Sequence, residues 1–177
     1  SDGAMRVAIV GDPVEHSLSP VMQNAAFASA GLKWEMIRVR VPAGGGADVI
    51  NRVRAGEFAG LAVTMPLKEE AARSVDDLDA ASTRQRSVNT VVGIGSGHAR
   101  GLSTDGAGFV NSLYAQDIAL TGARVHLLGA GGAARSIVAA LGAIDGCEVT
   151  ISNRTHSAAE AAAELSGSAQ AVVADNL

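Results

Sequence analysis

The sequence predicts an α/β protein in two parts, an α/β unit with a mostly parallel sheet followed by the first half of a doubly wound fold. Short apolar runs typical of strands alternate with helical patterns along the 177 residues. Hydrophobic residues make up 47% but aromatic residues only 3%, so the core must consist of Ala, Val, Leu and Ile, which suits helices packed on a parallel sheet.

The first part contains strands and helices in alternation. Ser19-Pro20 predicts an N-cap followed by proline at the first helical position, and Gly31 ends that helix. The turn at 95–97 predicts a hairpin, and with it an antiparallel edge of the sheet. Strands are expected at 6–11, 37–41, 60–64, 88–94 and 98–102, and helices at 21–30, 47–55 and from Pro66 onward.

The second part follows a helix expected at 105–116. Strands are expected next at 125–128, 148–152 and 171–174, and helices at 132–141 and 157–165. This order is one βαβαβ half, and a Rossmann-type fold is built from two such halves. We therefore expect a substrate-binding and catalytic domain at 5–104 and an incomplete nucleotide-binding domain at 105–177.

Composition argues against several classes of partner. Fourteen basic and eighteen acidic side chains give a net charge of −4, which leaves no basic footprint for nucleic acid. No apolar run approaches membrane-spanning length, and no signal peptide opens the chain. Cys147, the single cysteine, has no partner for an internal disulfide. We expect a cytoplasmic protein without membrane contact, and residues 1–4 look like an expression scar.

A glycine-rich stretch connects a predicted strand to a predicted helix, the context that a G-x-G-x-x-A fingerprint requires. The first glycine permits a tight turn and the second lets the backbone approach a pyrophosphate. A glycine-rich turn without a ligand is the alternative. The predicted cofactor-binding residues of this loop are Gly129, Ala130, Gly131, Gly132 and Ala133.

Asn153, Arg154 and Thr155 follow the next strand, where an NAD-selective protein usually has an acidic residue. A guanidinium binds a 2′-phosphate that a carboxylate would repel. We therefore predict NADP as the cofactor, with these three residues around the phosphate. The alternative is that Arg154 is an exposed loop charge.

Lys68 and Asp105 stand at loop-to-helix junctions and are the candidate catalytic pair. An ammonium and a carboxylate held close together can exchange a proton with a substrate hydroxyl. A surface ion pair is the alternative. The four histidines have no zinc-like spacing and Cys147 has no partner, so no metal is predicted.

Ser17 and Ser19 place two hydroxyls before a helix N-terminus, where a substrate carboxylate could bind. A plain N-cap role for Ser19 is equally compatible with the sequence. Asn89 and Thr90 lie in an apolar strand, where a polar side chain needs a partner, either a substrate hydroxyl or a backbone group.

Together these residues resemble the shikimate dehydrogenase family. Five motifs of the chain resemble motifs of this family and occur in the same order. They are Gly11 to Pro20 with Asn24 to Phe27; Val63 to Lys68; Ser87 to Thr90; Thr104-Asp105 with Gly108-Phe109; and the cofactor motifs Gly129 to Arg135 and Asn153 to Thr155. Ser103 departs from the family's usual asparagine. The chain also ends before the later segments of the family, which predicts a C-terminal truncation.

The resemblance implies an oxidoreductase of aromatic amino acid and chorismate biosynthesis that reduces 3-dehydroshikimate reversibly to shikimate with NADPH. Lys68 and Asp105 would be catalytic, with Ser17 and Ser19 on the substrate carboxylate. Thr64, Asn89 and Asp105 would bind the ring hydroxyls. A quinate/shikimate dehydrogenase paralogue and a non-catalytic truncated relative that binds shikimate or nucleotide are the alternatives, and a homodimer is left open.

Overall fold

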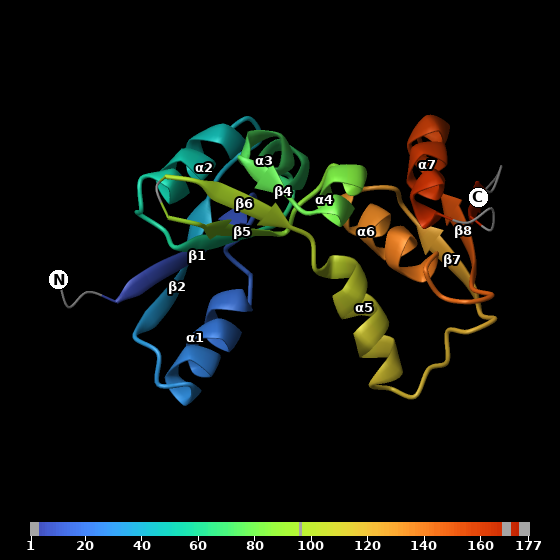
Figure 1. Ribbon diagram of the computed structural model, residues 1–177, viewed down its shortest axis with the longest axis horizontal. Coiled ribbons are helices and arrows are strands. Elements are labelled where there is room, and N and C mark those ends of the chain that lie inside the picture. The colour runs from blue at the N-terminus through green and yellow to red at the C-terminus, as the bar shows by residue number, and fades with distance from the viewer. Residues whose placement is uncertain (1–3, 96, 168–170, 174–177) are drawn as a thin grey trace. The chain divides into compact units, whose positions relative to one another are not determined.

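The computed structural model describes residues 4–95, 97–167 and 171–173. The chain divides into two compact units, Ser1–Leu102 and Ser103–Leu177 (Figure 1). Each unit has its own sheet and its own buried core. The predicted α/β fold class is confirmed.

The first unit is built on a six-stranded sheet with the order β2-β1-β3-β5-β6-β4. Strand β1 pairs in parallel with β2 and β3, whereas β5 runs antiparallel to both β3 and β6. The strands are β1 Met5–Gly11, β2 Trp34–Arg40, β3 Gly60–Val63, β4 Asp77–Leu78, β5 Thr90–Gly93 and β6 Ala99–Leu102. The helices are α1 Ser19–Ser29, α2 Gly46–Arg54, α3 Lys68–Ser74 and α4 Ala80–Gln85.

Helix α2 shows how the sequence determines the core of this unit. Val49, Ile50 and Val53 lie on one helical face and are buried, as the helical spacing of apolar residues requires. They join β-strand residues and α3 in one apolar cluster. Helices α2 and α3 cover one face of the sheet and α1 packs on the other (Figure 1).

The first unit differs from the prediction in several details. Strand β2 begins earlier than predicted, at Trp34, and β5 begins later, at Thr90, so that Asn89 precedes the strand. The hairpin of β5 and β6 forms, but the edge strand is β4, which runs parallel to β6. Helix α3 starts at Lys68, two residues after Pro66, because the Leu67 amide first closes a turn onto the Thr64 carbonyl. Strand β4 and helix α4 were not predicted, since each is too short to show a hydrophobic period.

The second unit carries a parallel three-stranded sheet in the order β7-β8-β9. This arrangement is one half of a Rossmann-type sheet. The strands are β7 Arg124–Leu128, β8 Glu148–Ser152 and β9 Ala171–Val173. The helices are α5 Asp105–Tyr114, α6 Gly132–Leu141 and α7 His156–Ala163, followed by the 3₁₀ turn η1 Glu164–Ser166.

The predicted bounds of α6 and β8 are confirmed, but the last predicted helix ends earlier because η1 tightens its final turn. Residue 174, the predicted end of the last strand, lies outside the described residues.

Cys147 precedes β8 and is buried in the core of the unit, and this burial raises the pKa of its thiol. No helix in the described parts of the chain combines the length and apolar character needed to cross a bilayer.

Candidate functional site

A cavity of about 430 Å³ lies in the first unit at the carboxyl ends of β1 and β3. In parallel α/β sheets this is the edge at which ligands bind. Three of the predicted substrate-binding residues, Ser17, Ser19 and Thr64, line it together. The remaining lining residues are Ile9, Pro13, His16 and Met65.

The floor of this cavity depends on a close approach of two loops. The Thr64 amide donates to the Val10 carbonyl at 2.9 Å, and the Asp12 amide donates to the Met65 carbonyl at 3.0 Å. A Cβ on Gly11 would lie 2.4 Å from Thr64 Cγ2 and 2.6 Å from the Met65 oxygen. Only glycine therefore permits the two strand ends to meet here.

Ser17 lies in a loop that is fixed from two sides. Its amide donates to the Val14 carbonyl at 3.0 Å, and Arg38 of β2 donates to its carbonyl through Nε at 3.0 Å and Nη2 at 2.6 Å. Arg40 forms a two-point pair with Asp12 at 2.8 and 3.2 Å, which raises the pKa of Arg40. Two arginines of β2 thus hold both ends of the loop 12–17.

Ser19 does not have the predicted N-cap position. Helix α1 begins at Ser19 itself, with Leu18 at the cap position, and the Ser19 amide donates to Ser17 Oγ at 3.2 Å. The α1 sequence therefore directs the first-turn backbone amide and both half-buried serines toward one region beside the cavity. This is a suitable environment for a small anion, since two hydroxyl groups lie there beside a helix N-terminus, whose dipole favours negative charge.

Lys68 and Asn89 do not line this cavity, but the backbone brings their segments alongside it. Lys68 is the first residue of α3, and its carbonyl accepts from the Val88 amide at 3.1 Å. The Asn89 carbonyl accepts from the Val63 amide at 2.7 Å, and Asn89 Oδ1 accepts from Thr90 Oγ1 at 3.0 Å. The side chains of Lys68 and Asn89 are half-buried. The predicted need of Asn89 and Thr90 for partners is thus met at least in part by each other.

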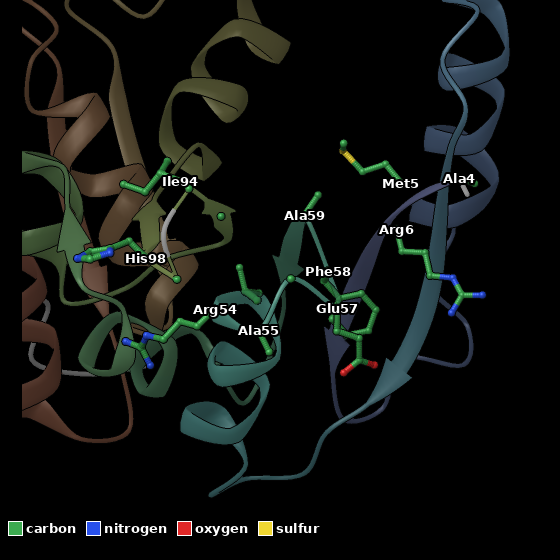
Figure 2. A pocket seen from close by; sticks show the side chains of 15 residues that line it. Ala4, Met5, Arg6, Arg54, Ala55, Glu57, Phe58, Ala59, Ile94 and His98 are labelled. Atoms are coloured by element: carbon green, nitrogen blue, oxygen red, sulfur yellow. The ribbon is translucent and has the colours of Figure 1, made fainter. Parts of the chain in front are cut away.

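A second hollow, of about 510 Å³, lies at the opposite, amino ends of β1 and β3 (Figure 2). Its charged side chains are engaged in ion pairs: Arg54 with Asp76 at 2.9 Å, Glu57 with Arg52, and Arg6 with Glu35 at 3.7 Å. The Ala59 amide on its wall donates to the Arg6 carbonyl. This hollow offers a ligand few free polar groups, so the cavity at the carboxyl ends is the better candidate.

The second unit places the glycine-rich loop between β7 and α6, as predicted. Gly129 has a φ of 104°, which favours glycine at this turn, and its amide donates to the Ser152 carbonyl at 2.7 Å. Among the described residues, no atom beyond the two adjacent residues lies within 4 Å of an added Cβ at Gly129 or Gly131. The backbone of the loop therefore borders open space, the condition a pyrophosphate would need.

Asn153, Arg154 and Thr155 follow the adjacent parallel strand β8, at the same edge of the sheet as the glycine-rich loop. Asn153 Nδ2 donates to the Thr155 carbonyl at 2.9 Å, which closes this loop on itself. Arg154 is exposed. The eight predicted cofactor residues thus lie in two neighbouring loops and in the first turn of α6, which begins at Gly132, at one edge of the sheet.

Asp105 is the first residue of α5, as its predicted place at a loop-to-helix junction requires, and it is half-buried. The next residue, Gly106, donates its amide to Ser136 Oγ of α6 at 2.9 Å. Ser136 Oγ also forms a hydrogen bond with Ser103 Oγ at 2.9 Å. Ser136 escaped the sequence reasoning, although a glycine inside the Asp105-Gly106-Ala107-Gly108 helix start signals a close contact.

No group of three or more histidine, cysteine, aspartate or glutamate side chains that could hold a metal ion is present among the described residues. The cavity of the first unit offers hydroxyl groups, and the half-buried side chains of Lys68 and Asn89 lie on segments beside it, so this unit can form hydrogen bonds to polar groups of a ligand.

The fold and the loops define a class first: a two-unit α/β protein whose second unit is a Rossmann-type half with a glycine-rich turn. Residues 9–91 match the family model described as shikimate dehydrogenase substrate binding domain. The chain is 40% identical over 173 residues to a shikimate dehydrogenase (NADP(+)) of Gluconobacter oxydans, covering 97% of this chain and 61% of that protein. The chain is thus similar to shikimate dehydrogenases over nearly all of its residues, and its first unit matches their substrate-binding domain.

Solved structures show the same similarity. The shikimate 5-dehydrogenase of Thermus thermophilus, in complex with NADP(H) and shikimate, is 39% identical with a TM-score of 0.84, covering 95% of this chain and 62% of that one. The shikimate dehydrogenase of Aquifex aeolicus is 31% identical with a TM-score of 0.88, covering 98% and 63%. The chain spans about three fifths of the length of these relatives.

Proposed function

We propose that this protein is an NADP-dependent shikimate dehydrogenase that reduces 3-dehydroshikimate reversibly to shikimate in chorismate biosynthesis. The observation that carries the proposal is the cavity shared by Ser17, Ser19 and Thr64 within the residues that match a shikimate dehydrogenase substrate-binding domain. The Thermus thermophilus relative that was solved with shikimate and NADP(H) supports the same ligands here.

The substrate carboxylate would bind at the start of α1. Ser17 and Ser19 offer hydroxyl donors there, and the two hydrogen bonds from Arg38 keep the Ser17 loop in place. Thr64, Asn89 and Asp105 would bind the ring hydroxyls as hydrogen-bond partners. A site built to pair a substrate hydroxyl rejects analogues that lack it, because its own polar groups would be left unpaired.

NADPH, when bound, supplies the hydride to the ketone carbon. As the carbonyl oxygen gains negative charge, Lys68 would donate a proton to it, so the ketone becomes an alcohol with one hydride and one proton added. Asp105 would bind the same hydroxyl and orient the Lys68 ammonium toward it. In the reverse direction Lys68 would accept the proton.

The two loops of the second unit fit NADP in chemistry and in space. The open backbone at Gly129 and Gly131 would face the pyrophosphate, together with Ala130, Gly132 and Ala133. Arg154, exposed and with no acidic neighbour in the Asn153-Arg154-Thr155 segment, would bind the 2′-phosphate.

We also propose a cytoplasmic location and a homodimer. The single, buried thiol of Cys147 supports a cytoplasmic location, since reduced cysteines are typical of that compartment. A homodimer is consistent with the common preference of enzymes for two-fold symmetry, and sedimentation would test it.

The test is the shikimate-dependent reduction of NADP⁺ by the complete gene product, with quinate and NAD⁺ as competing substrates. We expect shikimate and NADP⁺ to be preferred, and Lys68→Ala to lower kcat by about 10²- to 10⁴-fold, the usual contribution of a positioned acid or base. Lys33→Ala, at an exposed lysine before β2, is the matched control. A preference for quinate would indicate the paralogue, and ligand binding without turnover a non-catalytic relative.

A further inference from the structure

We propose that Ser136 is a positioning residue that holds Asp105 in a fixed place relative to the glycine-rich loop. The inference rests on the proposed function, in which Asp105 binds the reacting hydroxyl and the loop binds the cofactor. It concerns only the second unit, where α5, α6 and the loop all lie.

Helix α5 is capped in an unusual way, by a side chain of another helix. Its cap residue, Thr104, has no side-chain capping bond, and the amide of Gly106 is one of the first-turn amides that lack a partner within the helix. Ser136 Oγ accepts from this amide at 2.9 Å. A serine on a different helix, thirty positions along the chain, therefore takes the role of the N-cap.

The hydrogen bond between Ser136 and Gly106 is buried. Ser136 is only 2% exposed, and Gly106 is buried as well, so water does not replace this hydrogen bond if it is lost. The Ser136 hydroxyl also bonds to Ser103 at 2.9 Å, on the other side of Asp105. One hydroxyl group thus contacts the chain both before and after Asp105.

Helices α5 and α6 pack closely at Gly106. A Cβ on Gly106 would lie 2.2 Å from the Ser136 carbonyl oxygen and 3.0 Å from Ala140 Cβ. Helix α5 therefore meets α6 backbone to backbone at this point, and the two run side by side in Figure 1. Such a contact leaves little freedom for α5 to slide or rotate.

Helix α6 connects this contact to the glycine-rich loop. Helix α6 begins at Gly132, the last glycine of the loop, and Ser136 lies about one turn further along. The path from the loop to Asp105 thus runs through one helical turn and one buried hydrogen bond. Ser103, which stands where the family usually has asparagine, takes part in this junction through its hydroxyl.

The experiment compares Ser136→Ala with Ser112→Ala, a control on α5 whose exposed hydroxyl donates to the Phe109 carbonyl of its own helix. Amide hydrogen exchange is measured by NMR on this chain, and kcat and KM on the complete gene product. In Ser136→Ala we expect exchange at Gly106 to rise about tenfold and kcat to fall about tenfold, as one lost buried hydrogen bond implies. The KM for NADP⁺ should change less than about twofold, because the loop itself is intact.

A merely structural role would accelerate exchange throughout the unit and leave kcat unchanged in the folded fraction, and either result would overturn the proposal. If Ser136→Ala does not fold, Ser136→Cys preserves the side-chain size with a weaker acceptor, and faster exchange at Gly106 is expected there too. Unchanged exchange in a folded Ser136→Cys would contradict the proposal. If the wild type shows no turnover, the proposed function fails, while exchange at Gly106 still decides whether Ser136 holds α5.

Discussion

Arg86, immediately after α4, has a left-handed backbone conformation with a φ of 50°. This conformation strains residues that carry a Cβ but not glycine. We expect Arg86→Gly to raise the free energy of unfolding by about 0.5–1 kcal/mol, after the greater freedom of glycine in the unfolded chain is subtracted.

Urea denaturation measures this change, and Arg84→Gly is the matched control. Arg84 is an exposed residue within α4, where glycine should lower the free energy of unfolding by up to about 1 kcal/mol. A loss of stability in both variants would contradict the strain at Arg86.

Asp76 links α2 to β6 in the first unit and makes part of its stability depend on pH. Hydrogen bonds from Arg54 and from the Ala99 amide lower the pKa of Asp76 from 3.8 to about 2. Because the folded pKa is the lower one, the stabilisation is complete above about pH 4 and is lost as the pH falls toward 2.

We therefore expect Asp76→Asn to unfold at a lower urea concentration than the wild type at neutral pH. The gap between the two midpoints should narrow as the pH falls from about 4 to about 2. Asp77→Asn, at the exposed neighbour that contacts Arg100 at 3.3 Å, is the control. A gap that stays constant over this range would show that Asp76 does not stabilise the fold through its charge.

Some site residues can be predicted from a sequence pattern, whereas others are recognised only from their contacts in the folded structure. Ser17, Ser19 and Thr64 could be predicted to meet, because each lies at the carboxyl end of a strand or the start of the following helix. Ser136 could not, because its hydrogen bonds join positions that are distant in sequence and share no periodicity. The start of α1 at Ser19 was missed because Ser17, not Ser19, accepts the capping bond.

At the scale of elements, the contact between α5 and α6 reverses the usual effect of a glycine substitution in a helix. Gly→Ala normally stabilises a helix interior by about 1 kcal/mol. Gly106→Ala should instead destabilise the protein by about 1–3 kcal/mol, because its Cβ would overlap the Ser136 carbonyl. Gly108→Ala, on the same helix, should follow the normal rule, because an added Cβ there meets no atom within 4 Å in the described part of the chain outside the adjacent helix backbone.

Thermal unfolding of the two variants tests this contact. A lower melting temperature for Gly106→Ala and a higher one for Gly108→Ala are expected. Equal shifts in the same direction would mean that the helices separate enough to accommodate the methyl group.

Elements could be predicted where the sequence marks both of their ends. Helix α6 follows a glycine turn, and β8 alternates polar and apolar residues in the order Glu-Val-Thr-Ile-Ser, so both could be predicted and their bounds are confirmed. Strand β4 has two residues and α4 has six, too few for a period, and α4 depends on a local cap in which Asp79 accepts from the Ser82 amide at 2.7 Å. The start of α3 depends on the turn at 64–67, which competes with the helix-starting tendency of Pro66.

On the scale of the whole molecule, the fold class could be predicted because each unit repeats the strand-helix alternation and builds its own aliphatic core. The strand order could not, since the position of β4 beyond β6 depends on two backbone pairings without a sequence pattern. The roles proposed for Lys68 and Asp105 also concern the whole molecule, because the two residues lie in different units.

The central claim is that these two residues act on one hydroxyl group. A double-mutant cycle with Lys68→Ala, Asp105→Ala and the double variant in the complete gene product tests it most directly, with kcat/KM for shikimate as the readout. Residues that act as a unit are strongly non-additive, so the double variant should be little slower than the slower single variant. Additive losses, or single variants as active as the wild type, would contradict a shared site.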